Sequence, residues 1–291
     1  MNILHGYTKD GLNLSGFHWE SKNKNICVVF THGMYDNIIE NCFIETMGDY
    51  LSKNGYGLVF GHNRGYGVIN SIIVKNPVTE RWENKIIGST YEKFGECIYD
   101  IDLWIDEARK LGYKKIILAA HSLGCVKTLY YISKKGFENI EGFIFVSPPD
   151  ASGLARYRDN FKKMIEEAEK NIQNGESKKI MENKMLEIFP ISSRTFYNFR
   201  KNGPIDVFPV IENPSDFGIF SKITKPIFVT LGERDSIIIK SPEEDLKNLE
   251  EKAINCEEFC GKVIKGATHR YINREKELSQ SVLTWLKKYF Y

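Results

Sequence analysis

The sequence predicts neither a membrane-spanning segment nor a secretory signal nor a repeat architecture. Its 291 residues contain no apolar run long enough to span a bilayer, and its start, Met1 to Gly6, shows no basic stretch followed by a long apolar core. Internal repeats and low-complexity tracts are missing as well. Hydrophobic residues make up 42% and charged residues 27%, as in ordinary globular proteins, which excludes disorder and collagen-like structure.

An excess of charge of one sign is also missing. Lys and Arg together number 40 against 38 Asp and Glu, which leaves a formal net charge of +2. This balance provides no electrostatic reason to bind nucleic acid or an anionic membrane. We therefore expect a small molecule as the partner, with neither nucleic acid nor a membrane surface involved.

Cysteine is sparse, at six residues in the whole chain. Without an export signal, the simplest interpretation is reduced thiols in the cytoplasm, so we expect a cytoplasmic protein with no disulfide framework. Cys256, Cys260 and His269 could be imagined as metal ligands, but their spacing is loose and no fourth ligand is evident. We expect no metal and no organic cofactor.

Short apolar runs alternate with amphipathic stretches along much of the chain. The dipeptide Asp10-Gly11 predicts a turn between two strands. Further strands are predicted at 26–30, 57–60, 115–119, 142–146, 226–231 and 261–264. Helices are predicted at 43–51, 94–108, from 124 onward, 243–253 and 278–289. This alternation predicts a mostly parallel sheet of about eight strands with helices on both faces.

A long interval between Pro148 and Pro226 shows no convincing strand. Because a crossover between parallel strands needs only about a dozen or more residues, the surplus is interpreted as an insertion. Apolar spacing predicts three helices within it, at 161–172, 181–188 and 192–200. The expected domains are a core of residues 1–150 and 222–291 and a helical cap of residues 151–221.

The stretch from Ile116 to Cys125 carries the most specific chemical signal. An apolar strand runs into A-H-S-L-G and then into a helix. This A-x-S-x-G pattern is typical of a nucleophile elbow, with Ala120 where a glycine usually stands. The turn is tight, so the residues two before and two after the serine must be small, as Ala120 and Gly124 are. Such a turn would hold Ser122 in a strained conformation with its hydroxyl above the sheet edge.

A serine hydroxyl needs a base to remove its proton, and in this pattern the acid and the base follow the serine along the chain. His269 is the only histidine after Ser122, so it is the candidate base. Asp235 lies just beyond a predicted strand and is the favoured acid, with Glu233 and Asp150 as rivals. The sequence therefore predicts a triad of Ser122, Asp235 and His269.

The motif His32-Gly33-Met34 follows another predicted strand. The oxyanion of a tetrahedral intermediate needs two backbone N–H donors. We expect one from Leu123, directly after the nucleophile, and the other from Met34, in the loop after Gly33. His32 is expected to be structural, and Arg64 is expected to pair with a buried acid or with backbone carbonyls.

Together these residues resemble the serine α/β-hydrolases over nearly the whole chain. A narrower similarity, to a poorly characterised hydrolase family that includes the fungal siderophore esterases, rests on several short motifs. They are HGM at 32–34 with EN at 40–41, NRG at 63–65, YDID at 99–102, SPPD at 147–150 and FPISSRT at 189–195. The resemblance implies the α/β-hydrolase fold and cleavage of esters, including macrocyclic lactones, by Ser122, Asp235 and His269. Ala120 is the departure from the usual elbow.

The predicted function is a serine hydrolase that cleaves a carboxylic ester or lactone of a small molecule through an acyl-enzyme. A thioesterase or acyltransferase would use the same triad and is kept as an alternative. Dehalogenases and epoxide hydrolases need an aspartate nucleophile, so Ser122 disfavours both. A non-catalytic ligand-binding protein is the alternative from another class, and the intact serine, acid and base argue against it.

The predicted cap is rich in aromatic side chains and in arginine. In one interpretation the aromatic rings form the core of the cap. In the other, part of them roofs a pocket above Ser122 suited to an apolar or aromatic acyl ester or lactone. The second interpretation makes Tyr35, Tyr157 and Phe196 substrate contacts. The dense charge of the cap disfavours a triacylglycerol lipase.

Overall fold

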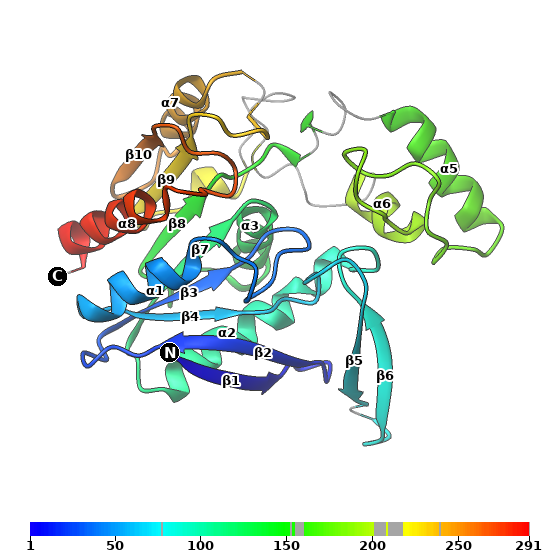
Figure 1. The fold of residues 1–291 in the computed structure, drawn as a ribbon, viewed down its shortest axis with the longest axis horizontal. Helices are drawn as coiled ribbons and strands as arrows, with labels where there is room; N and C mark the ends of the chain where they lie inside the picture. Colours follow the sequence, from blue (N-terminus) through cyan, green and yellow to red (C-terminus); the bar gives the residue numbers. More distant parts are fainter. Residues whose placement is uncertain are drawn as a thin grey trace.

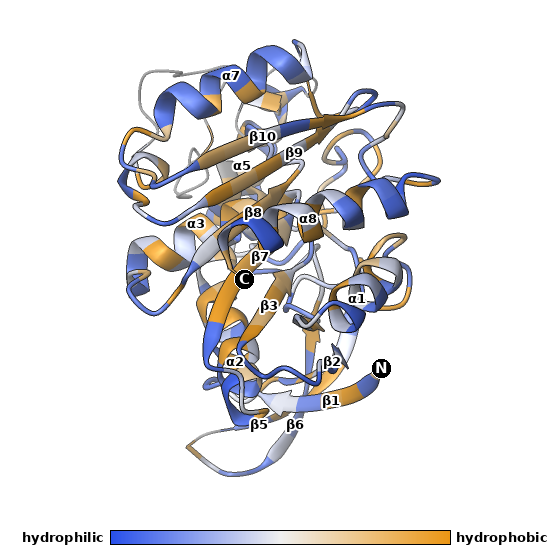
Figure 2. Ribbon diagram, turned by 90° about the vertical axis from the view of Figure 1, so that its left-hand side faces the viewer, coloured by the Kyte–Doolittle hydropathy of each residue, from blue (hydrophilic) through white to orange (hydrophobic). Residues whose placement is uncertain are grey.

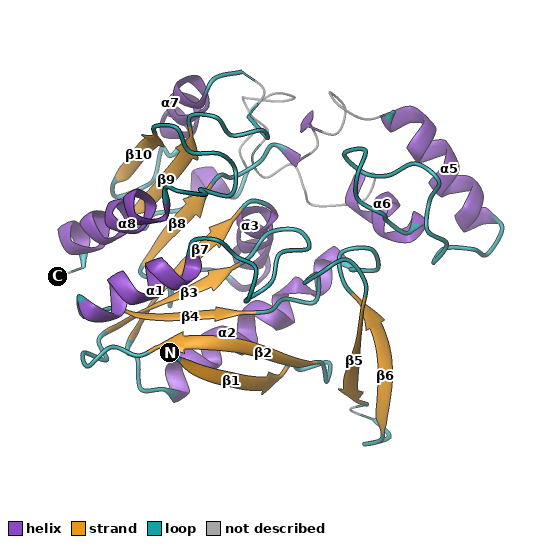
Figure 3. Ribbon diagram, viewed as in Figure 1, coloured by secondary structure: helices purple, strands orange, loops and turns teal. Residues whose placement is uncertain are grey.

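A computed structural model describes residues 1–76, 78–151, 153, 154, 160–200, 208, 218–238 and 240–290 of the chain. Its main body is an eight-stranded sheet with helices on both faces (Figure 1). A two-stranded sheet and a pair of helices lie to one side of this body (Figure 3). None of the helices in these residues is long and apolar enough to cross a membrane.

The main sheet is mostly parallel, as predicted. Its strands are β1 (Asn2–Tyr7), β2 (Asn13–Trp19), β3 (Ile26–Thr31), β4 (Gly57–Gly61), β7 (Lys115–His121), β8 (Gly142–Val146), β9 (Ile227–Gly232) and β10 (Phe259–Ile264). They run in the order β1-β2-β4-β3-β7-β8-β9-β10. β2 pairs antiparallel with β1 and β4, and the other neighbours pair parallel. This order brings the carboxyl ends of β3, β7, β8, β9 and β10 to one edge.

Helices cover both faces of the sheet because successive side chains of a buried strand point to opposite sides. In β3, Val29 packs into one hydrophobic cluster, whereas Val28 and Phe30 belong to another. The helices of the first cluster are α2 (Cys97–Lys110), α3 (Leu123–Lys135) and α7 (Pro242–Lys252), and those of the second are α1 (Ile44–Lys53) and α8 (Glu275–Tyr289). Figure 2 shows the hydrophobic residues concentrated in the central strands between these layers.

The two-stranded sheet was not expected from the sequence. It consists of β5 (Asn70–Lys75) and β6 (Trp82–Ile87), paired antiparallel. Of the twelve residues in these two strands, only Ile72, Val74 and Ile87 have buried side chains. With the remaining positions partly or fully exposed and many of them polar, the apolar alternation that identifies a strand is too weak to be recognised.

An inserted segment between β8 and β9 contains α5 (Phe161–Gln173) and α6 (Ser193–Arg200), as predicted. The prediction of a helix at 181–188 is wrong. The chain forms turns there, and Met185 and Phe189 pair through an isolated bridge. Leu186 and Glu187 have φ angles of 50° and 64°, in the left-handed region that interrupts an α-helix. Short 3-10 turns span Phe94–Glu96 (η1) and Phe220–Lys222 (η2).

Candidate active site

Ser122 occupies the sharp turn between β7 and α3. Its φ and ψ angles are 54° and −129°, a strained conformation for a residue with a side chain, as the elbow pattern predicted. Its N–H donates to the carbonyl of Val146 at 2.9 Å. A Cβ atom on Gly124 would lie 2.3 Å from the carbonyl oxygen of Thr31. Gly124, two residues after the serine, therefore lets α3 begin directly against the end of β3.

Three predicted side chains come together from three loops at the carboxyl edge of the sheet. Ser122 Oγ lies 2.9 Å from Nε2 of His269, and Nδ1 of His269 lies 3.0 Å from Oδ1 of Asp235. With the proton on Nδ1 donated to the carboxylate, Nε2 is free to accept the proton of the serine hydroxyl. The arrangement can therefore activate a nucleophile.

Asp235 is held by more than the histidine. The hydroxyl of Ser147 donates to Oδ2 of Asp235, and the N–H of Ile237 donates to Oδ1 at 3.1 Å. Burial of the carboxyl opposes its ionisation, but hydrogen bonds from His269 and Ser147 outweigh this effect and hold the pKa of Asp235 below its ordinary value. Asp235 is thus a carboxylate at neutral pH.

Ser147 and Tyr271 are two site residues that the sequence did not reveal. The Ser147 hydroxyl contacts both Asp235 and the Tyr271 hydroxyl, which is 2.9 Å away and itself donates to Thr230 O at 3.3 Å. Tyr271 is fully buried. Ser147 and Tyr271 both have a positive φ angle, 49° and 55°, which is uncommon for residues other than glycine. No local pattern in the sequence predicts this backbone conformation.

The two rival acids are engaged elsewhere. Asp150 accepts a hydrogen bond from the N–H of Gly153 at 2.8 Å, and Glu233 accepts one from Gly266 at 2.7 Å. In the described part of the chain, Asp235 is the carboxylate that binds Nδ1 of His269. Geometry therefore separates alternatives that the sequence could only rank.

The residues considered as metal ligands do not meet. Cys256 donates its thiol to the carbonyls of Lys225 and Glu258, and both ring nitrogens of His269 are used by Asp235 and Ser122. Across the described ranges, no group of three or more His, Cys, Asp and Glu side chains is arranged to hold a metal ion.

Gly33 brings the loop after β3 against the nucleophile. A Cβ atom at this position would lie 3.0 Å from Cβ of Ser122 and 3.3 Å from the carbonyl of His121. Leu123 is the first residue of α3, where a backbone N–H has no partner within the helix. In the described residues, no backbone hydrogen bond uses the N–H of Leu123 or of Met34. Both predicted donors are thus available beside Ser122.

His32 holds the peptide group that carries one of these donors. The backbone N–H of Asn63 donates to Nε2 of His32 at 2.9 Å, so the ring proton sits on Nδ1 and is donated to the carbonyl of Gly33 at 2.8 Å. Complete burial lowers the pKa of His32 well below its ordinary value, which keeps the ring neutral. Because the Gly33–Met34 peptide is planar and trans, fixing its carbonyl also fixes the direction of the Met34 N–H.

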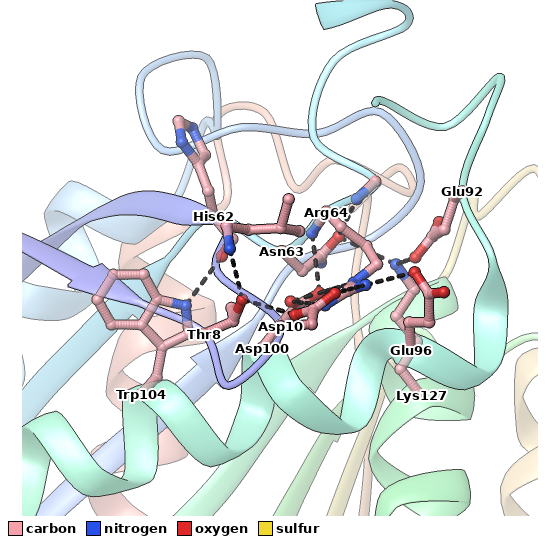
Figure 4. A network of polar contacts seen from close by, with 12 residues as sticks. Thr8, Asp10, His62, Asn63, Arg64, Glu92, Glu96, Asp100, Trp104 and Lys127 are labelled. Atoms are coloured by element: carbon pink, nitrogen blue, oxygen red, sulfur yellow. Dashed lines mark hydrogen bonds and ion pairs between the residues drawn. The ribbon is translucent and has the colours of Figure 1, made fainter. Parts of the chain in front are cut away.

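A buried polar network supports this loop from below (Figure 4). Lys127, fully buried on α3, donates to Oδ1 of Asn63 at 3.0 Å and pairs with Glu92. The guanidinium of Arg64 binds Asp100 at 2.9 Å, which confirms the expected pairing with a buried acid. The network therefore links the nucleophile helix to the loop after β4.

A cavity of about 330 Å³ opens above Ser122. We call its side from the sheet edge the core wall: Gly33, Met34, Ser122, Leu123 and His269. We call its side from the inserted segment the insert wall: Met185, Leu186, Ile188, Phe189 and Phe199. Other apolar residues that line it are Pro149, Ala151, Leu154 and Ile237.

The three predicted substrate contacts have different outcomes. Tyr35 lines the cavity, with its ring centroid 4.2 Å from that of Phe189. Phe196 does not line it: its side chain is completely buried in a cluster with Met164 and Met185. Phe199, one turn further along α6, lines the cavity in its place. Tyr157 lies outside the described residues.

Polar groups at the cavity come mainly from the loops after β3 and β10. Burial raises the pKa of Asp36, whereas burial and the charge of His269 lower the pKa of His121 to about 3. The neutral His121 ring donates from Nε2 to the carbonyl of His269 at 2.9 Å and so holds the backbone of that residue. Arg270 lines the cavity and donates to the carbonyl of Glu40 at 3.0 Å.

The sheet order, the strained serine at the β7–α3 turn and the position of the site define this chain as an α/β hydrolase by fold. It belongs to the family described as "Protein of unknown function (DUF1749)", whose model matches residues 91–288. A comparison with curated proteins finds no match.

Solved structures of similar fold include esterases of low sequence identity. A Pyrococcus furiosus esterase, Pf2001, is 19% identical with a TM-score of 0.63, over 100% of this chain and 91% of that one. Est1E from Butyrivibrio proteoclasticus with bound ferulic acid is 16% identical with a TM-score of 0.68, over 98% of both chains. A thermophilic esterase from Thermogutta terrifontis with bound malate is 15% identical with a TM-score of 0.61, over 100% of both. These likenesses concern the fold.

Proposed function

We propose that this protein is a serine hydrolase that cleaves a carboxylic ester or lactone of a small molecule through an acyl-enzyme. The observation that supports the proposal is the continuous set of contacts from Ser122 Oγ to His269 and on to Asp235, at 2.9 and 3.0 Å. A surface serine, histidine and aspartate meeting by chance would not also stand at a strained elbow against a glycine loop.

In the first step, Nε2 of His269 takes the proton of Ser122 as Oγ attacks the ester carbonyl carbon. The resulting imidazolium is stabilised by the Asp235 carboxylate, which stays ionised. His269 then delivers the proton to the leaving alkoxide as the carbon–oxygen bond breaks. In a lactone the alcohol remains attached to the acyl-enzyme.

The negative oxygen of the tetrahedral intermediate is bound by the N–H groups of Met34 and Leu123. Each such donor contributes about 3 kcal/mol to lowering the barrier in comparable sites. Water, deprotonated by His269, then attacks the acyl-enzyme through a second tetrahedral intermediate and releases the acid. The proton returns to Ser122, so the enzyme is regenerated without a metal or cofactor.

The apolar insert wall supports an acyl or alcohol group that is apolar or aromatic. The aromatic side chains of Phe189, Phe199 and Tyr35 line the cavity. Arg270 also lines it and would contact a polar group of the substrate. Est1E, a structural neighbour, holds ferulic acid, an aromatic acid. We propose that the inserted segment acts as the cap of the site, and that the protein works in the cytoplasm, where its six free thiols stay reduced.

The test is a Ser122→Ala variant assayed with p-nitrophenyl acetate and with an aryl ester. We expect turnover to fall by about 10⁵-fold or more, because no other group can form the acyl-enzyme. A fluorophosphonate probe should label the wild type at Ser122 and leave the variant unlabelled. An unlabelled wild type with no turnover on esters, thioesters or lactones would favour the non-catalytic alternative, and retained turnover in the variant would refute the assignment of the nucleophile.

A further inference from the structure

A second cavity, of about 490 Å³, lies between the β5–β6 sheet and the start of α6. Among the described residues, it shares no lining residue with the cavity above Ser122. Its wall is formed by Leu12, Arg64, Asn84, Lys85, Ile86, Ile87, Tyr91, Glu92, Lys93, Glu96, Lys178 and Arg194. Five of these residues are cationic and two are carboxylates, so cations outnumber carboxylates in the wall.

Both carboxylates in the wall already have cationic partners. Glu92 pairs with Lys127 beneath the cavity. Glu96 lies 2.6 Å from Arg64 and 3.2 Å from Lys93. Figure 4 shows the side chains of Glu92 and Glu96 close to the amine of Lys127 and the guanidinium of Arg64. Neither carboxylate is therefore free to balance further positive charge.

Three cations of the wall have no partner among the residues that the structure describes. Lys85, Lys178 and Arg194 make no ion pair and no side-chain hydrogen bond with any residue in the described ranges. Lys85 has only a longer-range attraction to Asp10, which two hydrogen bonds tie to Arg64. In Arg194 the Nε atom is buried and has no hydrogen-bond partner in the part of the chain that the structure describes. Leaving such a charged donor unpaired is unfavourable, because it loses its hydration without gaining a partner.

The backbone holds these cations at the cavity. The N–H groups of Arg194 and Ser193 donate to the carbonyls of Ser177 and Lys179, at 2.8 and 2.9 Å, which sets Lys178 beside the first turn of α6. These bonds use the N–H groups of Ser193 and Arg194, and the N–H of Thr195 donates to the hydroxyl of Ser192 at 3.3 Å. A ligand in the cavity would therefore be bound by side chains and not by the backbone of this turn.

On the other side of the cavity, the β5–β6 pairing sets the direction of Lys85. It lies opposite Ile72 and two residues before Ile87, and both of those side chains are buried. Because alternate residues of a strand share a face, Lys85 projects toward the body of the protein. Cations from both sides therefore face the same space.

We propose that this cavity binds a small molecule carrying a phosphate or diphosphate group. A planar guanidinium binds two phosphate oxygens at once, and two ammonium groups supply the remaining charge and hydrogen bonds. The concave, mixed polar and apolar wall suits a small ligand. The bound anion would connect the β5–β6 sheet to the inserted segment. Nearby, the hydroxyl of Thr90, in the loop after β6, donates to the carbonyl of Pro190, and the N–H of Ser192 donates to the carbonyl of Thr90.

The test is calorimetric titration of the full wild-type chain with inorganic pyrophosphate and, separately, inorganic phosphate, at two concentrations of sodium chloride. We expect saturable binding at one site and a higher melting temperature in the presence of the anion, since a ligand of the folded state stabilises it by mass action. The double variant Lys178→Gln/Arg194→Gln should weaken binding by about tenfold for each lost cation.

A matched control removes the same charge from exposed lysines on β10 and α8, as Lys262→Gln/Lys276→Gln. This variant should bind like the wild type, and Lys85→Gln, from the opposite wall, should weaken binding without altering α6. Circular dichroism checks that each variant is folded. Absence of binding to the wild type up to about 10 mM, or equal weakening in the control variant, would overturn the proposed site.

Discussion

In the candidate active-site cavity, hydrogen bonds hold the side chains behind the core wall, whereas apolar packing holds the side chains of the insert wall. Behind the core wall, His32, His121 and Ser147 each bind a group of the site. On the insert wall, Met185 packs in a small hydrophobic cluster of the inserted segment, with Met164 and Phe196, and the ring of Phe189 lies against that of Tyr35. Directional bonds fix atoms to within tenths of an ångström, and apolar contacts tolerate substitution.

This difference separates reaction type from substrate choice. The atoms that would move protons and hold the oxyanion all lie on the core wall. The insert wall offers shape and apolar surface, which discriminate substrates by only about 1–3 kcal/mol per group. Changes to the core wall should therefore alter kcat by orders of magnitude, and changes to the insert wall should alter selectivity modestly.

The largest effect after loss of the nucleophile is expected from Asp235→Asn. The amide would donate to Nδ1 of His269, favouring the tautomer with the proton on Nε2, which cannot accept the proton of Ser122. By analogy with other triads, kcat should fall by about 10⁴-fold. Steady-state kinetics on p-nitrophenyl acetate measures the fall.

Asp150→Asn is the matched control for Asp235. Asp150 binds the N–H of Gly153 and not His269, so we expect kcat to stay within about tenfold of the wild type. If Asp150→Asn were the more damaging change, the acid would have to be reassigned to the loop after β8.

The buried pair beneath the core wall should be important for stability. Lys127→Met leaves Glu92 as an uncompensated buried charge, so the free energy of unfolding should fall by about 3–5 kcal/mol. Urea denaturation followed by circular dichroism measures this. The double change Lys127→Met/Glu92→Gln removes both charges and should restore much of the loss; a double variant no better than the single one would assign the effect to packing.

A smaller effect on kcat is expected from His32→Leu. Without the ring N–H, the Gly33 carbonyl is free to turn, and the Met34 N–H loses its fixed direction. We expect kcat to fall by about 10–100-fold with KM changed much less, because the oxyanion forms only in the transition state. His62→Leu is the control, since the His62 ring accepts from the N–H of Ile38 and lies edge-on to the His32 ring, and it is His32 that hydrogen-bonds the Gly33 carbonyl. Equal losses in both variants would point to general damage.

The smallest effect should come from the insert wall. Phe189→Ala should lower kcat/KM for an aryl ester by about tenfold while leaving the acetate ester nearly unchanged, since only the larger group reaches that ring. Phe161→Ala, in the cluster behind the cavity, serves as the control. If an ester panel responds identically to both variants, the wall does not select substrates.

The residues of the candidate site could be named from the sequence because their signals are local or ordered along the chain. A strand, A-x-S-x-G and a helix are contiguous, so Ser122 and the Leu123 N–H follow from one motif. His269 followed by elimination, and Asp235 from its place after a strand. The parallel sheet was predictable from the alternation of apolar runs, whose periodicity reflects burial on two faces.

Tertiary structure decided everything that depends on which distant side chains meet. Ser147 binds Asp235 and also contacts the hydroxyl of Tyr271, which lies more than 100 residues further along the chain, and no local pattern marks either residue. Phe196 and Phe199 share one helix, and only the packing of α6 decides that Phe199 faces the cavity while Phe196 is buried. The buried pairing of Lys127 with Glu92, likewise, is a matter of geometry between α3 and a loop. A sequence states which groups are present, and the fold decides which of them are close enough to act on one another.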